Sequence, residues 1–308
     1  MDEIGDTNYK FNSKEIENIW DIFFCLADST FSSVDMSYGK KGPYMLSGET
    51  MTSICKTIEN IDFCFHRDAY SDAYTLVRKY RDDLMQYLFV LNVIQNKHGL
   101  TDKETEKFTI NSESMMKMIE LDVAILVSGE RKTDAELAME KLIYNVLESS
   151  ENEKDRKQFF DTSKYKSYLV SNNEKVKYIF DNFLVDKWLR EDRKLNNYVH
   201  ANGIRFVMDN YIYQDKKENK DREFIETIQN ITDIFLSLLS VIDSIKFHSS
   251  DYLDALEMDM EPQEGSQYWV CPIIVEYMND RFDKKLLQYI QNNEGNGMQF
   301  TAEYYADC

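Results

Sequence analysis

The sequence predicts an all-α fold, a helical bundle with additional C-terminal helices, formed by residues 1–308 as a single domain. Glycine and proline, which turns between strands consume, occur only 10 and 3 times in 308 residues. Leucine, isoleucine, methionine, lysine and glutamate are abundant, which favours helices. Aromatic residues make up 13% of the chain and provide material for a large core.

Three N-terminal helices are expected where apolar residues recur at intervals of three and four. The first covers residues 13–38 and the second 48–65, with a break at 39–43 that contains two glycines and a proline. The third covers residues 71–96. Because only a short break precedes it, the second and third helices are expected to form an antiparallel hairpin.

The middle of the chain combines short helices with one charged segment. Residues 113–127 and 133–147 have the spacing of shorter helices. Residues 149–173 are charged and irregular, and are interpreted as an insertion or linker. Residues 174–201 then predict a long helix with a break near 184–187.

The C-terminal third contains the most apolar long helix, expected at residues 222–247 after a charged break at 216–221. Threonine, serine and aspartate interrupt this helix, so we interpret it as a core helix and expect no membrane span. Residues 268–292 begin with a strand-like stretch and are expected to be helical after Pro272.

The net charge of −19 argues against a protein that coats nucleic acid non-specifically, because phosphate binding requires clustered lysine and arginine. It leaves open a local basic site or a basic partner protein. The cysteines form no CxxC pair and are odd in number, which favours reduced thiols in a cytoplasmic protein. No cluster of cysteine and histidine has the spacing of zinc ligands. The acidic N-terminus has no signal-peptide pattern. The five cysteines are Cys25, Cys55, Cys64, Cys271 and Cys308.

The stretch 193–200 holds the candidate catalytic residues. It consists of Arg-Lys-Leu-Asn-Asn-Tyr-Val-His, so Arg193 and His200 lie two turns apart on one helix face. A guanidinium group binds phosphate in bidentate fashion, and an imidazole transfers protons near neutral pH. We therefore interpret Arg193 and His200 as a catalytic pair, with Asn196 and Asn197 orienting them or binding the substrate.

The same residues also have a structural interpretation. Ala-Asn-Gly follows His200 and ends the helix, so the imidazole would interact with the last carbonyl groups and the helix dipole. Arg193 would then pair with Glu191 or Asp192. An exposed position for Arg193 and His200 favours catalysis, whereas a buried His200 with a backbone partner favours a scaffold.

The spacing of Arg193 and His200 near the end of a long helix resembles the Arg-x4-6-His motif of the HEPN superfamily. That resemblance covers residues 174–203 and implies a helical-bundle ribonuclease of the toxin–antitoxin, abortive-infection or CRISPR defence systems. It implies RNA as the substrate, no metal or cofactor, and a homodimer in which two motifs face each other. Lys194 stands where many members have asparagine, aspartate or histidine.

A second group of charges lies on the third helix, where Arg78, Arg81 and Asp82 share one face. Apolar neighbours indicate partial burial, and buried charges must be paired. One interpretation is an internal salt-bridge network. In the other, Arg78 or Arg81 lines the same cleft as His200 and binds the substrate. This stretch resembles the corresponding helix of bacterial abortive-infection proteins.

Further residues are assigned to partner or substrate binding. We assign substrate binding to Arg190, Lys194 and Tyr198, which flank the motif. A local basic patch would offset the negative charge there, formed by Lys187, Arg190, Arg193, Lys194 and Arg205. The acidic segment 251–264 is interpreted as a solvated loop or a partner-binding surface.

These observations favour a metal-independent endoribonuclease of bacterial phage defence or a toxin–antitoxin response. The RNA 2′-hydroxyl would attack the adjacent phosphate, His200 would move the proton, and Arg193 would stabilise charge on the phosphorane. The alternative is a non-catalytic acidic helical protein that binds a basic partner or toxin. We expect an antitoxin or another defence protein as a partner, and we expect no contact with a membrane.

Overall fold

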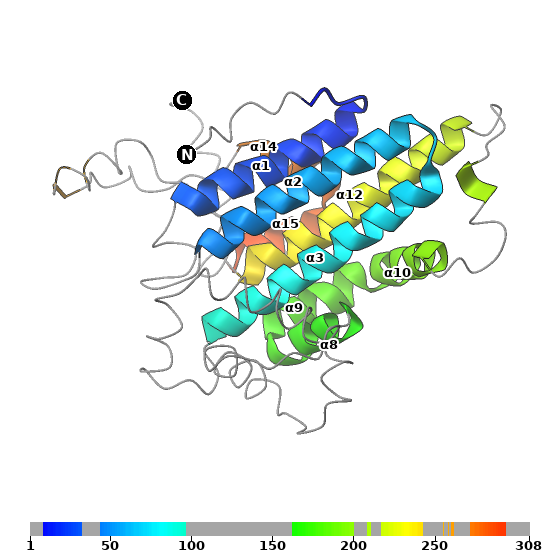
Figure 1. The fold of residues 1–308 in the computed structure, drawn as a ribbon. Helices are drawn as coiled ribbons and strands as arrows, with labels where there is room; N and C mark the ends of the chain where they lie inside the picture. The colour runs from blue at the N-terminus through cyan, green and yellow to red at the C-terminus, as the bar shows by residue number, and fades with distance from the viewer. Residues whose placement is uncertain are drawn as a thin grey trace, which may run out of the picture.

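The computed structural model describes six stretches of the chain and a few single residues between 255 and 261; the stretches are 9–32, 44–96, 162–199, 208–210, 217–242 and 272–293. Every regular element within these stretches is helical, so the all-α prediction is confirmed (Figure 1). The helices expected at 113–127 and 133–147 lie outside the described residues.

The N-terminal part consists of α1 (Lys14–Ser32), α2 (Tyr44–His66) and α3 (Tyr70–Asn96), which contact one another in sequence order. The predicted hairpin of α2 and α3 is confirmed. Its turn passes through Asp68, which has a φ of 59°, a left-handed conformation that aspartate tolerates better than most residues.

The segment before α1 is fixed to α2 from Tyr9 onward. The Asp62 carboxylate is fully buried and accepts hydrogen bonds from the backbone N–H groups of Asn12 and Ser13, at 3.0 and 3.1 Å. The Tyr9 hydroxyl donates to the same carboxylate at 2.9 Å. These bonds satisfy donors that α1 itself leaves unpaired at its start.

Helix α12 (Lys217–Ile242) lies at the centre of the bundle, where every residue from Asn230 to Ile242 is buried. Figure 1 shows it beside α3, with α14 (Pro272–Arg281) and α15 (Lys284–Gln291) on its far side. Its buried hydroxyls donate to carbonyl groups of the preceding turn, as in Thr232 to Ile228 at 2.9 Å, so they need no outside partner.

Of the described helices, only α12 is long and apolar enough to cross a membrane by length and composition. However, 83% of that apolar window is buried inside the protein. This burial favours the predicted core helix. The expected break at 216–221 is wrong from Lys217 onward, where α12 begins. Lys217 and Lys220 pair with Asp68 and Asp209, which offsets part of the high charge of this stretch.

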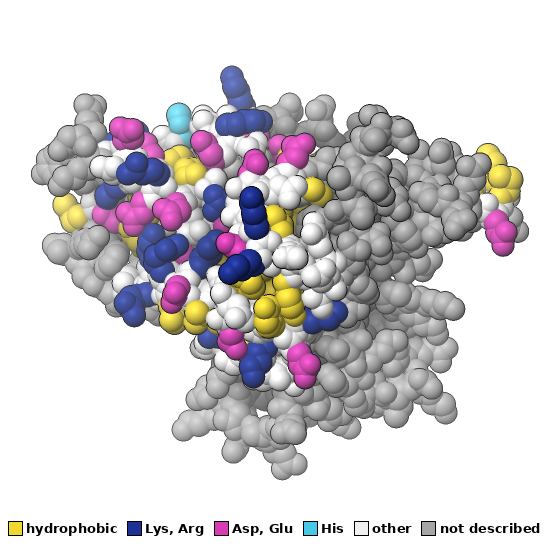
Figure 2. All heavy atoms as spheres, turned by 180° about the vertical axis from the view of Figure 1, so that it is seen from behind, with side chains coloured by type: hydrophobic (Ala, Val, Ile, Leu, Met, Phe, Trp, Pro, Cys, Tyr) yellow, Lys and Arg dark blue, Asp and Glu magenta, His cyan; other side chains and the backbone are white. Residues whose placement is uncertain are grey.

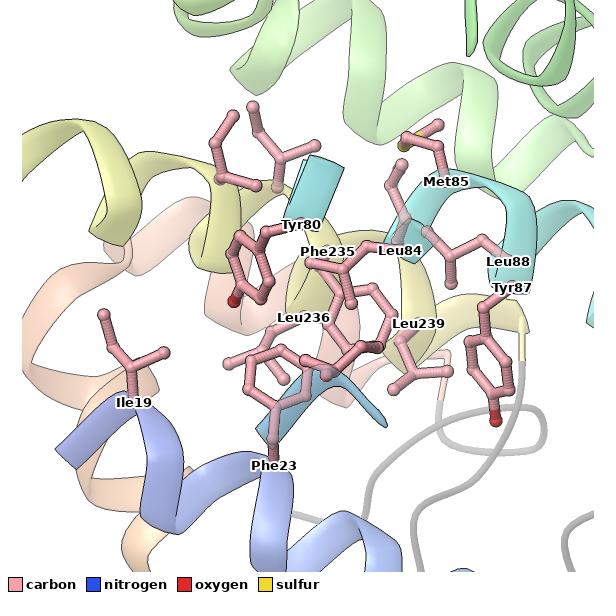
Figure 3. Close-up of a cluster of buried hydrophobic side chains, with 14 of the residues drawn as sticks. Ile19, Phe23, Tyr80, Leu84, Met85, Tyr87, Leu88, Phe235, Leu236 and Leu239 are labelled. Carbon is pink, nitrogen blue, oxygen red and sulfur yellow. The ribbon is translucent and has the colours of Figure 1, made fainter. Parts of the chain in front are cut away.

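Aromatic and aliphatic side chains from α1, α3 and α12 form the core shown in Figure 3. The Phe23 ring lies 5.5 Å from Tyr80 and 5.4 Å from Phe235. The Tyr80 hydroxyl shares a 2.9 Å hydrogen bond with Thr232, so this buried polar group is satisfied inside the core. Contacts among three helices that are distant in sequence therefore fix the position of α3 against α12.

The predicted long helix 174–201 is present as α9 (Glu174–Ile179), a π-helical turn (Phe180–Leu184) and α10 (Val185–Val199). The π-helical turn lies just before the break expected near 184–187. Asn173 caps α9 by accepting hydrogen bonds from two backbone N–H groups. Helix α8 (Thr162–Asn172) falls within the segment expected to be irregular, so that expectation is wrong for these residues.

Helices α14 and α15 confirm the helical prediction after Pro272. Asp283 separates them and caps α15 with its side chain. The expectation of reduced cysteines holds for Cys55 and Cys64, which are free. It is wrong for Cys25, which is disulfide-bonded.

Candidate functional site

Helix α10 carries the described part of the predicted motif and has two distinct faces. Trp188, Glu191 and Leu195 are buried against the bundle. Arg193 lies on the other face and is exposed, as is Leu189, which keeps 54% of its surface accessible. The helix therefore presents the predicted phosphate-binding arginine to solvent.

Three other cations of α10 are paired with acids. Lys187 Nζ lies 2.7 Å from the Asp233 carboxylate. Arg190 Nε donates to Glu191 at 2.9 Å. Lys194 Nζ lies 3.5 Å from Glu191, and it also contacts α12 through Thr227 at 3.0 Å and Glu223 at 3.2 Å. Although Lys187, Arg190 and Lys194 lie near Arg193 in sequence, their charges are largely neutralised within the protein.

Arg193 differs from these neighbours because no residue in the described stretches pairs with its guanidinium group. The structural interpretation expected an acid to pair with Arg193, and Glu191 and Asp192 are the acids nearest in sequence. Instead, Glu191 accepts from Asn230 at 2.8 Å as well as from Arg190, and Asp192 pairs with Arg81 at 2.7 Å. Both acids are therefore engaged elsewhere, and Arg193 remains open to an anion from solvent.

The remaining predicted catalytic residues are placed only in part. Asn196 and Asn197 are partly buried, one turn beyond Arg193. His200 lies outside the described residues, as does Arg205 of the expected basic patch. The pairing of Arg193 with His200 thus stays a prediction from the helical spacing.

Tyr198, a predicted substrate-binding residue, makes contacts within the protein. Its ring stacks on that of Tyr74 with centroids 4.1 Å apart. Its hydroxyl donates to Asp209 in the short 3-10 helix η3 (Met208–Asn210). Burial raises the pKa of the Tyr198 hydroxyl, and the bond to Asp209 raises this pKa further, so the group remains a proton donor.

Arg81 and Arg78, the other predicted substrate-binding residues, belong to a charge network between α3 and α10. Arg81 is 2% exposed and lies 2.7 Å from both Asp82 and Asp192. Its guanidinium group also lies 5.6 Å from the Trp188 ring centroid. Arg78 Nε lies 3.5 Å from Asp82. The arrangement matches the predicted internal salt-bridge network and leaves Arg81 with almost no accessible surface.

A second buried charge network was not predicted from the sequence. The Asp233 carboxylate accepts from Lys187 on α10 and from Tyr277 and Arg281 on α14, at 2.7–2.9 Å. Burial is the main cause that raises the pKa of the Tyr277 hydroxyl. The sequence signal was the recurrence of polar residues at three-residue spacing in the most apolar helix: Thr227, Asn230 and Asp233.

The face of the protein seen in Figure 2 carries charges of both signs. Figure 2 shows lysine and arginine side chains interleaved with acidic ones rather than gathered into a basic patch on that face. A hollow of about 570 Å³ lies between the start of α1 and α12, with Lys14, Glu15, Phe65, Arg222 and Glu226 among its lining residues. Among the described residues, no group of histidine, cysteine and acidic side chains is arranged to hold a metal ion.

We compared the chain with protein-family models, curated proteins and solved structures. No significant match was found in any of the three comparisons. The resemblance to the HEPN superfamily therefore depends on the motif spacing and on the helical architecture alone.

Proposed function

We propose that the protein is a metal-independent endoribonuclease of HEPN type that acts in bacterial phage defence or a toxin–antitoxin response. The observation that carries this proposal is the exposed Arg193, which is unpaired among the described residues while three cations beside it are neutralised. An arginine kept free on a helix surface suits bidentate binding of a phosphate group.

The proposed reaction is an internal transfer at phosphorus. The 2′-hydroxyl attacks the adjacent phosphate as His200 removes its proton, and the bond to the 5′-oxygen of the next nucleotide breaks. The protonated imidazole then supplies the proton to that leaving oxygen. Arg193 stabilises the charge that develops on the phosphorane, so its contribution is larger in the transition state than in the bound substrate. Two copies of the chain would bring two Arg193–His200 motifs together.

The net charge of −19 slows the approach of RNA, because the electrostatic field of the whole protein repels the phosphate groups. Since Lys187, Arg190 and Lys194 are engaged with acids, they offset this field less than the sequence suggested. Recognition of RNA would thus depend on a few close contacts at Arg193, and because few phosphates are contacted, RNA binding would depend only weakly on salt.

A second candidate function, binding of a basic partner protein such as a toxin, is favoured by the same charges. The side chains of Glu223 and Glu226 keep 58% and 60% of their surface exposed. Because the cations of α10 other than Arg193 are paired with acids, the face formed by α10 and α12 has little free positive charge. A lysine-rich model peptide would then raise the thermal midpoint at physiological salt, and RNA would have no effect on it.

Cleavage of cellular RNA in EDTA by wild-type and His200→Ala protein tests the first proposal, with circular dichroism on both. Cleavage by the wild type alone, with equal helicity, supports the nuclease. Absence of cleavage by either favours the binding protein. Loss of helicity in the variant means that His200 has a structural role.

A further inference from the structure

The end of α10 is fixed by four residues that we call the α10 latch: Tyr74, Tyr198, Asp209 and Lys220. Tyr198 stacks on Tyr74 of α3, and its hydroxyl donates a hydrogen bond to Asp209 of η3. Lys220 of α12 donates to the other oxygen of the Asp209 carboxylate at 2.5 Å. The latch therefore joins the last turn of α10 to α3 and α12.

The short helix η3 is itself held in place at the adjoining residue. The Asn210 side chain accepts from the backbone N–H of Ser71 at 2.7 Å and donates to Asp72 at 3.1 Å, both in the first turn of α3. Figure 1 places η3 at the end of the bundle where α10 ends and α12 begins. Asp209 consequently offers Tyr198 an anchor that is fixed from two sides.

Tyr198 of the latch and Arg193 lie on different sides of α10. Tyr198 lies five positions after Arg193, which corresponds to about 7.5 Å along the axis and about 140° around it in an α-helix. Because the Tyr198 ring is held against the bundle, Arg193 is directed away from it. The chain continues from this turn directly into His200.

We propose that Tyr198 is a positioning residue for the site at Arg193, acting through the α10 latch, rather than a substrate-binding residue. This inference depends on the proposed nuclease function. The hydroxyl bond to Asp209 fixes the rotation of the last turn, and a small misplacement of a catalytic group lowers the rate of reaction far more than it lowers substrate affinity.

The test uses Tyr198→Phe in the full chain, which keeps the ring stack and removes the hydroxyl bond. The matched control is Tyr178→Phe. The Tyr178 ring also stacks on a tyrosine, Tyr289, at 4.2 Å, but its hydroxyl has no partner among the described residues. Asp209→Asn serves as a second variant that weakens the same bond if Tyr198→Phe does not fold.

We expect Tyr198→Phe to lower kcat for RNA cleavage by about 10- to 100-fold with little change in KM, while Tyr178→Phe has no effect. Amide exchange should accelerate in the last turn of α10. In an Arg193→Lys background the substitution should cause no further loss, because the latch acts through Arg193.

Three results would overturn the inference in distinguishable ways. If the wild type does not cleave RNA, the proposed function and the positioning role both fail. If the wild type cleaves and Tyr198→Phe cleaves equally fast, only the positioning role fails. If Tyr198→Phe causes the same loss in the Arg193→Lys background, the tyrosine acts independently of the arginine.

Discussion

Replacing Asp233 with asparagine removes the charge that joins α10, α12 and α14. The Asp233 side chain is 2% exposed and lies 2.7 Å from Lys187 and 2.8 Å from Arg281. Removing one partner of a buried ion pair typically costs about 3–5 kcal/mol. Because the side chains of Lys187 and Arg281 keep 27% and 24% of their surface exposed, water compensates part of this loss. We therefore expect Asp233→Asn to lower the free energy of unfolding by about 3 kcal/mol.

Urea unfolding followed by far-ultraviolet circular dichroism measures this change, with Glu17→Gln as the matched control. Glu17 also loses its charge in an isosteric substitution, but its ion pair with Lys14 is on the surface, and such pairs contribute little. The reasoning about the buried network is refuted if both variants unfold at the same urea concentration as the wild type.

Three further predictions concern the interior of the bundle. Burial raises the pKa of the Tyr74 and Tyr198 hydroxyls. The folded protein should therefore lose stability as the pH rises above about 10, where tyrosines of the unfolded chain ionise. The absorbance change of tyrosine ionisation should coincide with the loss of helicity. Ionisation of these tyrosines before the protein unfolds would contradict the prediction. Burial raises the pKa of Cys55 to about 12, so a thiol reagent at neutral pH should leave it unmodified until the protein unfolds; rapid labelling in the native state would count against it. Arg81→Lys should cost about 2 kcal/mol in a urea titration because lysine cannot reproduce both carboxylate bonds, and a wild-type midpoint would show that the second bond contributes nothing.

Helical periodicity was sufficient to predict most of the described helices. The apolar spacing of α3 and of 174–199 is regular enough to fix their extent within a few residues. Helix α8 was missed because it is short and follows the charged stretch 149–161, although Tyr165, Tyr168 and Leu169 form a buried stripe on it. The π-helical turn lies close to the predicted break, since the spacing of apolar residues changes there.

The sequence predicts which cations lie on α10, but it does not predict which of them pair with acids of the protein. The sequence places four cations within eight positions of α10, and nothing in their spacing distinguishes them. Residues of α12 and α3 decide which are neutralised: Glu223 and Asp233 of α12 pair with Lys194 and Lys187, and Arg81 of α3 engages Asp192, only after the bundle has formed. The same holds for Tyr198, whose partner Asp209 lies on another element.

RNA cleavage in EDTA by Arg193→Ala and Arg67→Ala protein, each beside the wild type, tests the central claim most directly. Both arginines are exposed, but Arg67 lies in the turn between α2 and α3 with its guanidinium group 5.0 Å from the Phe63 ring centroid, whereas Arg193 has no partner among the described residues. The proposed mechanism predicts that Arg193→Ala cleaves at least about 100-fold more slowly at unchanged helicity, while Arg67→Ala cleaves like the wild type. Equal cleavage by Arg193→Ala and the wild type would contradict it.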